Sequence, residues 1–416
     1  MEWDSILVEV YMFLERHIFS YVEKMTKQFK VILIIGSRQV GKSTMLKEKF
    51  LSKYEYVVLD DFFELDVAKN DPSLFLKNHN IPLIIDEIRR VPELFLQIKY
   101  IVDKSNEKGS IILTGSQSYS LLKNVSDSLA GRVCIIDMAC LSLREKLKID
   151  FNLPFLPTEE YLEKRYKKIK KYDNLWGHIQ RGSMPELYNN EIEWETFYRS
   201  FVRTYIERDV ADLINVNNLL KFNNFMKCLA SRTGELINFA SLATDVGVTL
   251  KTIQEWTSIL ESSGIIYLLH SYENNLTKRT VKTPKVYFMD TGLVCYLVGW
   301  SNAQVAMNGA MNGALFENFV ISEIIKSYYN AGLSIQNLYF YRDKEKREID
   351  LLIEKDGSLY PIEIKMTARP SADMAKNFFV LNNIFGKKVE KGTILCQCEK
   401  KTFLSENLVA LPIEYI

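Results

Sequence analysis

The stretch Val31-Ile-Leu-Ile-Ile35, followed directly by Gly36-Ser-Arg-Gln-Val-Gly-Lys-Ser43, decides the fold of this chain. The consecutive apolar residues predict a strand that is buried on both faces, and the residues after it match the phosphate-loop pattern G-x-x-x-x-G-K-[ST]. The two glycines let the backbone point its N–H groups at a phosphate chain, and a helix that starts near Lys42 aims its positive end at the same anion. This stretch therefore predicts a nucleotide site.

Individual positions of the loop have separate predicted roles. Lys42 should reach the β- and γ-phosphates, and the Ser43 hydroxyl should be a ligand of Mg²⁺. The residues that we expect around the nucleotide are Gly36, Ser37, Arg38, Gln39, Val40, Gly41, Lys42, Ser43, Thr44, Asp86, Thr114 and Ser116.

Composition limits the class of protein. A length of 416 residues predicts two to four domains, and 47% apolar with 25% charged residues is typical of a globular protein. A net charge of +1 argues against a broadly basic nucleic-acid coat, so any such contact must be local. The six cysteines form no CxxC pair and only four histidines are present, which argues against a zinc site. Without a bilayer-spanning apolar run or a basic N-terminal region, we expect no membrane contact and a cytoplasmic location.

Short apolar strands alternate with helical stretches after the phosphate loop. We expect an N-terminal helix within residues 6–29 and further strands at 56–60, 82–86, 110–114 and 133–137. Such alternation predicts an α/β fold with a parallel sheet covered by helices on both faces.

The predicted strand at 82–86 is followed to its end by two carboxylates that can take part in the nucleotide chemistry. Asp86 can hold the Mg²⁺ hydration shell, and Glu87 can orient or deprotonate the attacking water. Thr114 and Ser116 end the next strand and could touch the γ-phosphate, although a plain strand-to-helix turn is the alternative. Arg132 precedes the last strand and could stabilise transition-state charge in a neighbouring subunit, or simply pair with a carbonyl. The first role would require a homo-oligomer.

Four motifs together resemble a large group of prokaryotic AAA-superfamily ATPases over residues 15–145. They are Gly36–Ser43, Leu83-Ile-Ile-Asp-Glu-Ile-Arg-Arg-Val-Pro92, Leu113-Thr-Gly-Ser-Gln117 and Leu129-Ala-Gly-Arg132. The resemblance implies the sheet order and helical lid of that superfamily, ATP or ADP as the nucleotide, and the intersubunit role of Arg132. Members also carry a poorly understood C-terminal region, whose recurring pieces match Gly182–Glu186, Glu207–Val210 and Lys285–Leu293 here.

The sequence pattern at 149–235 predicts a helical lid, which contains a basic run at 163–171. The pattern at 236–300 predicts a winged helix. Helices at 239–246 and 250–261, the second capped by Thr249, precede strands at 265–269 and 285–288. The predicted second helix is not basic, whereas the wing between the two strands carries basic residues. One interpretation is that the wing contacts DNA. Packing against a partner protein or the ATPase domain is the other. The basic residues of the wing are Lys278, Arg279, Lys282 and Lys285.

A second group of candidate site residues lies in the last hundred residues. Glu317 falls on an apolar helix, Asp350 on a strand, and Glu363 with Lys365 on the following strand. Alternation along a strand places Glu363 and Lys365 on one face, where Asp350 can join them. Carboxylates on one face bind Mg²⁺, with Asp350 and Glu363 as ligands, and the lysine can activate a water. This pattern resembles the PD-(D/E)xK nuclease fold and predicts a restriction-endonuclease-like domain at 301–416, after an ATPase core at 1–148.

Two functions follow from these motifs. In the first, Mg²⁺-dependent ATP hydrolysis controls a C-terminal half that engages DNA and carries a nuclease-type site. In the second, the chain is an ATP-dependent switch or remodeller that binds a protein partner, and the nuclease-like domain is inactive.

Overall fold

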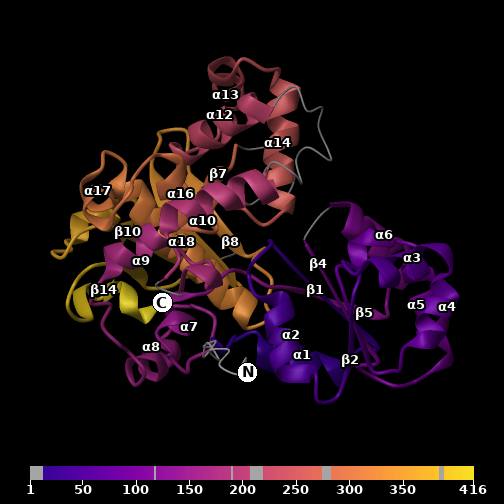
Figure 1. Cartoon of the computed structure of the whole chain (residues 1–416). Helices are drawn as coiled ribbons and strands as arrows, with labels where there is room; N and C mark the ends of the chain where they lie inside the picture. The colour runs from indigo at the N-terminus through magenta and orange to yellow at the C-terminus, as the bar shows by residue number, and fades with distance from the viewer. Residues whose placement is uncertain (1–12, 117–118, 189–190, 207–218, 274–282, 384–387) are drawn as a thin grey trace, which may run out of the picture.

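The computed structural model describes residues 13–116, 119–188, 191–206, 219–273, 283–383 and 388–416 (Figure 1). Three of the predicted wing cations, Lys278, Arg279 and Lys282, lie outside these ranges, as does the motif at 207–210.

The first sheet is five-stranded and parallel, with the order β2-β3-β4-β1-β5. This confirms the α/β core that the sequence predicts. The limits of β1, β2, β3 and β4 differ from the prediction by one or two residues, and those of β5 agree. The strands are β1 (Val31–Gly36), β2 (Glu55–Val58), β3 (Leu83–Asp86), β4 (Ile111–Ser116) and β5 (Val133–Asp137).

Helices cover both faces of this sheet because alternate residues of each buried strand point to opposite sides. Ile32 and Ile34 of β1 belong to the core that α1 and α2 cover, whereas Leu33 and Ile35 belong to the core that the other helices cover. The predicted N-terminal helix is shorter than expected, since α1 starts only at Phe19. The helices are α1 (Phe19–Thr26), α2 (Lys42–Phe50), α3 (Phe62–Asn70), α4 (Pro72–Asn78), α5 (Leu94–Lys104) and α6 (Tyr119–Leu129), with the short turn η1 (Ile88–Arg90).

Helical segments follow the first sheet. The basic run at 163–171 is helical only in its first part, because α8 ends at Tyr166, and its Arg165 is fully buried against the carbonyl of Ile416. These segments are α7 (Leu143–Lys146), α8 (Glu159–Tyr166), α9 (Leu175–Arg181), η2 (Pro185–Tyr188), α10 (Trp194–Phe201), η3 (Val202–Ile206) and α12 (Leu219–Ala230).

The two helices and two strands that the sequence predicts between residues 239 and 288 are present. Thr249 caps the second helix through a hydrogen bond from the Thr252 amide, and the two strands pair antiparallel. The elements are α13 (Phe239–Val246), α14 (Leu250–Ser262), β6 (Ile266–Leu269) and β7 (Lys285–Phe288), followed by α16 (Thr291–Leu297).

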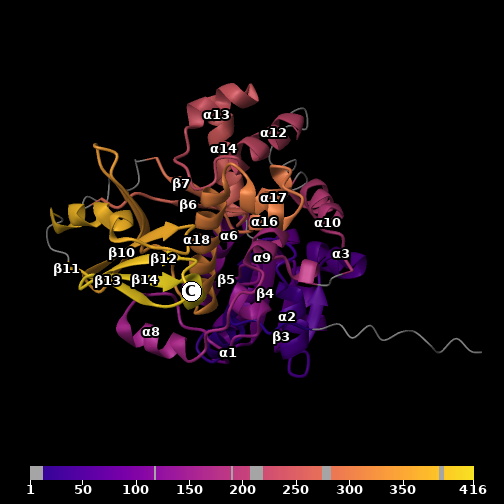
Figure 2. The same cartoon turned by 90° about the vertical axis from the view of Figure 1, so that its left-hand side faces the viewer.

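A seven-stranded mixed sheet forms the end of the chain, with the order β13-β14-β12-β10-β9-β8 and β11 beside β10. The long helix α18 lies between this sheet and the first one (Figures 1 and 2), and both sheets contribute to one hydrophobic core with it. The elements are α17 (Ala303–Asn308), α18 (Asn312–Asn330), β8 (Leu338–Arg342), β9 (Glu348–Lys355), β10 (Ser358–Lys365), η5 (Ala372–Asn383), β11 (Lys388–Val389), β12 (Gly392–Cys396), β13 (Thr402–Ser405), β14 (Leu408–Pro412) and η6 (Ile413–Tyr415).

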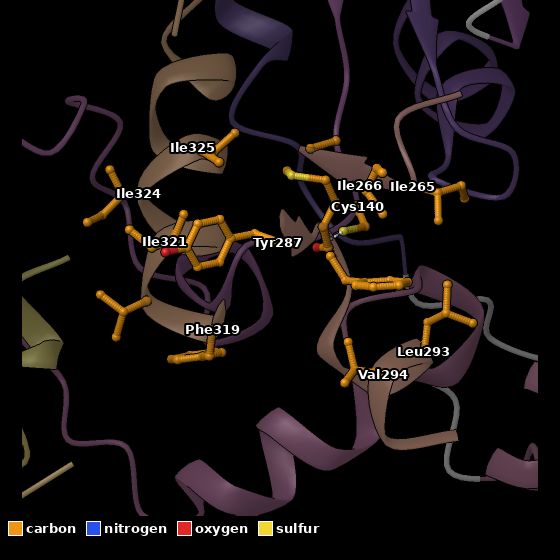
Figure 3. Packing of buried hydrophobic residues seen from close by; sticks show 14 of the residues in the cluster. Cys140, Ile265, Ile266, Tyr287, Leu293, Val294, Phe319, Ile321, Ile324 and Ile325 are labelled. Carbon is orange, nitrogen blue, oxygen red and sulfur yellow. Dashed lines mark hydrogen bonds between the residues drawn. The ribbon is translucent and has the colours of Figure 1, made fainter. Parts of the chain in front are cut away.

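The two halves of the chain meet in this shared core. Cys140, which follows the last strand of the first sheet, lies close to Ile266 of β6, and the apolar side of α18 faces the same region (Figure 3). The Cys140 thiol donates a hydrogen bond to the Met289 carbonyl at 3.3 Å. No helix in the described part of the chain combines the length and apolar character needed to cross a membrane.

Candidate functional site

The phosphate loop connects β1 to α2 in the way that the sequence predicts. Gly41 has φ of 91°, a conformation that glycine adopts without strain, and α2 begins at the next residue, Lys42. Gly36 has no room for a side chain, because a Cβ atom there would collide with the carbonyl of Met138. The loop is therefore held between its own strand and the segment that follows β5.

Lys42 is buried at the base of this loop. Its Nζ donates hydrogen bonds to the carbonyls of Gly36 at 3.0 Å and Ser37 at 2.8 Å. Burial lowers the pKa of Lys42 to about 8, although the nearby carboxylates of Glu87 and Asp86 oppose this shift. An ammonium group in this position lacks a full counter-charge, which a triphosphate would supply.

Asp86 is the last residue of β3, and its carboxylate is close enough to Lys42 to oppose the effect of burial on the pKa of that lysine. Its Oδ1 accepts hydrogen bonds from the Thr114 hydroxyl and from the Glu87 amide, the latter at 3.1 Å, and its Oδ2 accepts one from the Tyr56 hydroxyl. Thr114 thus holds Asp86 rather than pointing freely at the nucleotide. Tyr56 was not identified from the sequence, because only the side-by-side pairing of β2 and β3 brings it to the site.

Glu87 follows directly with φ of 58°, the left-handed conformation, which turns its side chain away from the line of the strand. Its Oε2 accepts a hydrogen bond from Arg89 Nε at 3.1 Å. Burial raises the pKa of Glu87, and Lys42 opposes the shift. A carboxylate with a raised pKa is a stronger base at neutral pH, as the predicted role requires.

Ser116 ends β4 directly beside Gly36. Its hydroxyl is buried, and it has no hydrogen-bond partner among the residues that the structure describes. Buried hydroxyls are nearly always paired, so this orphaned group at the loop fits a ligand. With the hydroxyl of Ser43 and the carboxylate of Asp86, the site offers the oxygen atoms that Mg²⁺ prefers.

Arg16 is a second residue that sequence reasoning missed. It is only 4% exposed, and its guanidinium donates to the Val40 carbonyl of the phosphate loop at 2.5 Å and to the Ala139 carbonyl at 2.8 Å. Its Nε pairs with Glu145 at 3.0 Å. An arginine before the first strand carries no motif, so only the folded chain reveals this contact.

Arg132 lies at the amino-terminal ends of the strands, whereas the phosphate loop lies at their carboxyl-terminal ends. The Arg132 carbonyl accepts a hydrogen bond from the amide of Val31, the first residue of β1. Its guanidinium forms a two-pronged pair with Asp103, at 2.5 and 3.0 Å, and also donates to the Ala130 carbonyl. Within one chain it does not reach the loop, so its catalytic role stays a prediction about an assembly of copies.

The second predicted set of residues also comes together. Lys365 Nζ lies 2.9 Å from Asp350 Oδ2 and 2.6 Å from Glu363 Oε2, and Asp350 accepts a further bond from the Ile364 amide at 2.8 Å. Burial and the Asp350 charge raise the pKa of Glu363 to about 9. Burial would also raise the pKa of Asp350, but Lys365 and Lys285 outweigh it and lower that pKa.

Glu317 belongs to this acidic site, but Lys285 occupies the space beside it. Lys285 Nζ lies 3.1 Å from Glu317 Oε1 and 2.6 Å from Glu348 Oε1, and the Tyr287 hydroxyl donates to Glu317 at 2.6 Å. The prediction that Lys285 belongs to an exposed basic wing is therefore wrong. It lies on β7, which packs against α18, and its side chain is almost completely buried.

The acidic site as it stands contains lysines between its carboxylates. In the described ranges, no three side chains of His, Cys, Asp or Glu group closely enough to hold a metal ion. The predicted ligands Asp350 and Glu363 are close to each other, but Lys365 bridges them.

A cavity of about 210 Å³ separates the start of the phosphate loop from the C-terminal half. Gly36 and Ser37 line one side, and Glu261, Tyr267 and Asp290 are among the residues on the other. The loop therefore has open space beside it at the junction of the two halves.

Comparison with protein families divides the chain into three matched regions. Residues 28–147 match an AAA domain, residues 172–304 a domain of unknown function (DUF8612), and residues 312–416 another domain of unknown function (DUF4143). The first region therefore matches the AAA domain that the motifs indicated, and it contains the phosphate loop and parallel sheet described above.

Similar proteins extend over most of the chain. The uncharacterized protein Rv2008c of Mycobacterium tuberculosis is 27% identical over 388 residues, which cover 93% of this chain and 80% of that protein. The uncharacterized protein MJ1544 of Methanocaldococcus jannaschii is 23% identical over 78% of this chain and 72% of its own length.

The chain also aligns with solved structures, at low identity and low TM-score. The Walker-type ATPase PABY2304 of Pyrococcus abyssi aligns over 68% of this chain and 96% of its own, with 11% identity and a TM-score of 0.38. AMPPCP-bound DnaA of Aquifex aeolicus aligns over 59% and 85%, with 17% identity and a TM-score of 0.26.

Proposed function

We propose that this chain is an Mg²⁺-dependent ATPase in which ATP hydrolysis controls a C-terminal half that engages DNA. One observation carries the ATPase part: a buried lysine and two strand-end carboxylates, Lys42, Asp86 and Glu87, meet at one phosphate loop. An AAA domain over residues 28–147 supports the same function.

The residues have distinct roles in this reaction. Lys42 and the loop amides bind the β- and γ-phosphates, and Ser43 and Asp86 hold Mg²⁺, which when bound neutralises charge on those phosphates. Glu87 takes a proton from the water that attacks the γ-phosphorus, while the bond from this phosphorus to the bridging oxygen breaks. Thr114 and Tyr56 hold the Asp86 carboxylate in place through hydrogen bonds from their hydroxyl groups.

ATP hydrolysis by the full-length protein tests this proposal. Wild type should release phosphate in Mg²⁺ and lose this activity in EDTA, and Lys42→Ala should neither bind nor hydrolyse ATP. Lys53→Ala, which removes an exposed lysine after α2, is the matched control and should keep the wild-type rate. Equal rates for Lys42→Ala and Lys53→Ala would refute the assignment.

DNA engagement is assigned to the acidic site of Asp350, Glu363 and Lys365. Their arrangement on neighbouring strands β9 and β10 supports a nuclease-type site, because a lysine and two carboxylates face one another. Plasmid and branched DNA should be cleaved in Mg²⁺ or Mn²⁺ by wild type but not by Asp350→Ala or Lys365→Ala. Lys388→Ala, an exposed lysine of the same sheet, should cleave like wild type.

The second candidate is an ATP-dependent switch that acts on a protein partner and has no nuclease activity. The observation that favours it is the pair of lysines, Lys285 and Lys365, whose ammonium groups lie between the carboxylates. Absence of cleavage together with an ATPase that DNA does not stimulate would support this candidate.

A further inference from the structure

Arg16 stands directly behind the phosphate loop. It donates to the Val40 carbonyl, and the nearest atom to a Cβ built on the next residue, Gly41, would be Arg16 Nη1 at 3.6 Å. A guanidinium group is rigid and planar, so its donors keep a fixed geometry relative to one another. If phosphate binding shifts the peptide between Val40 and Gly41, Arg16 must either move with this peptide or oppose the shift.

Glu145 fixes the other side of this guanidinium. Its side chain is fully buried, and its Oε1 accepts from Arg16 Nε and from the His17 amide at 2.8 Å. Its Oε2 accepts from the amide and hydroxyl of Ser142, at 2.7 and 2.9 Å, which completes a capping box at the start of α7. Arg16 is thus bonded to both the phosphate loop and the first turn of α7.

The same turn of α7 is bonded to the C-terminal half. The amide of Leu143, the first residue of α7, donates to Glu323 Oε2 of α18 at 2.7 Å. Glu323 Oε1 pairs with Lys326 at 2.8 Å, and Lys326 donates to the Ser183 hydroxyl at 2.9 Å. All three of these side chains are buried, where hydrogen bonds to charged groups hold their geometry strongly.

Helix α18 continues from this contact to the acidic site. Glu317 lies on the same helix as Glu323 and is bonded to Lys285 and Tyr287. An unbroken α-helix moves as a rigid element, so a displacement at Glu323 is also felt at Glu317. The described contacts therefore form a contiguous network from the loop to that site, and such a network can carry energetic coupling between distant sites.

We propose that Arg16 positions the phosphate loop for nucleotide binding and, through Glu145 and α7, couples that binding to α18. This inference rests on the proposed ATP binding. Because coupling is reciprocal, the position of α18 also changes the affinity of the loop for ATP. Arg16 acts through the Val40 carbonyl and contacts no phosphate itself, so it is a positioning residue.

The first experiment measures binding of a fluorescent ATP analogue with Mg²⁺ to the full chain. Arg16→Met should bind the analogue about tenfold more weakly than wild type, a typical size for a coupling effect. Arg16→Lys keeps the positive charge but lacks the planar guanidinium, so its affinity should lie between those of Arg16→Met and wild type. Lys49→Met is the matched control, because Lys49 belongs to the same region but pairs with Glu15 and contacts no loop carbonyl. Equal affinity of all three variants and wild type would overturn the inference and leave the ATPase standing.

The second experiment measures backbone hydrogen exchange of α2 and of residues 312–330 with and without the ATP analogue. In wild type, bound nucleotide should slow exchange in α18. Glu323→Gln should abolish this protection in α18 while bound analogue still slows exchange in α2, a combination that a merely structural role would not give. Protection of α18 that persists in Glu323→Gln would overturn the coupling. If wild type bound no analogue at all, both the inference and the proposed ATPase would fall.

Discussion

The pH dependence of nucleotide affinity follows from the burial of Lys42. Because its pKa is lowered to about 8, roughly nine tenths of its side chains are charged at pH 7 and only about one tenth at pH 9. A triphosphate binds the charged form and raises the pKa of Lys42 in the complex. The apparent Kd for the ATP analogue should therefore rise about tenfold from pH 7 to pH 9. The phosphates themselves lose their last proton near pH 6 and add little above pH 7.

The assay is a titration of the fluorescent analogue with Mg²⁺ at pH 7, 8 and 9. Lys42→Arg is the control, since a guanidinium stays charged over this range and its weaker binding should not vary with pH. This control retains Lys146, whose pKa burial also lowers to about 8, so it separates Lys42 from that second buried lysine. A wild-type Kd that is constant from pH 7 to pH 9 would refute the reasoning, as would an equal slope in Lys42→Arg.

Three further predictions concern Glu87, Arg132 and Gly182. Glu87→Gln should bind ATP normally but lower kcat by ~10²-fold or more in a phosphate-release assay, because an amide cannot accept the water proton; a wild-type kcat would remove Glu87 as the base. Arg132→Ala should lower kcat by about 10³-fold at unchanged affinity if copies assemble, and sedimentation at the assay concentration should show an oligomer; unchanged turnover would leave Arg132 as a surface partner of Asp103. Gly182→Ala should lower the free energy of unfolding by about 3 kcal/mol in urea denaturation, since its φ is 87° and a Cβ would strike the Tyr198 hydroxyl. Gly313→Ala, whose Cβ meets nothing within 4 Å in α18, is its control and should not destabilise.

The nucleotide site could be predicted because its chemistry is local. The phosphate loop consists of one strand, two glycines and the start of a helix in immediate succession. Asp86 is recognisable because it is an acidic residue at the end of a short apolar run. The alternation of short apolar strands with helices likewise predicted the first sheet, whose observed order places Asp86 and Lys42 together.

The supporting residues could not be predicted, because their partners are distant in sequence. Arg16 bonds to Glu145 across 129 positions, and Leu143 to Glu323 across 180. Lys285 was misassigned for a related reason: a lysine beside other basic residues is usually exposed, and only the packing of β7 on α18 buries it next to Glu317.

The acidic site draws its parts from two of the matched families. Lys285 and Tyr287 come from the region at 172–304, whereas the carboxylates that they contact come from 312–416. A fragment that starts at residue 312 would leave Glu317 without Lys285 and Glu348 with Arg342 alone, and it would expose the apolar side of α18. An exchange of this C-terminal segment for that of another protein would keep these pairs only if β7 were exchanged with it.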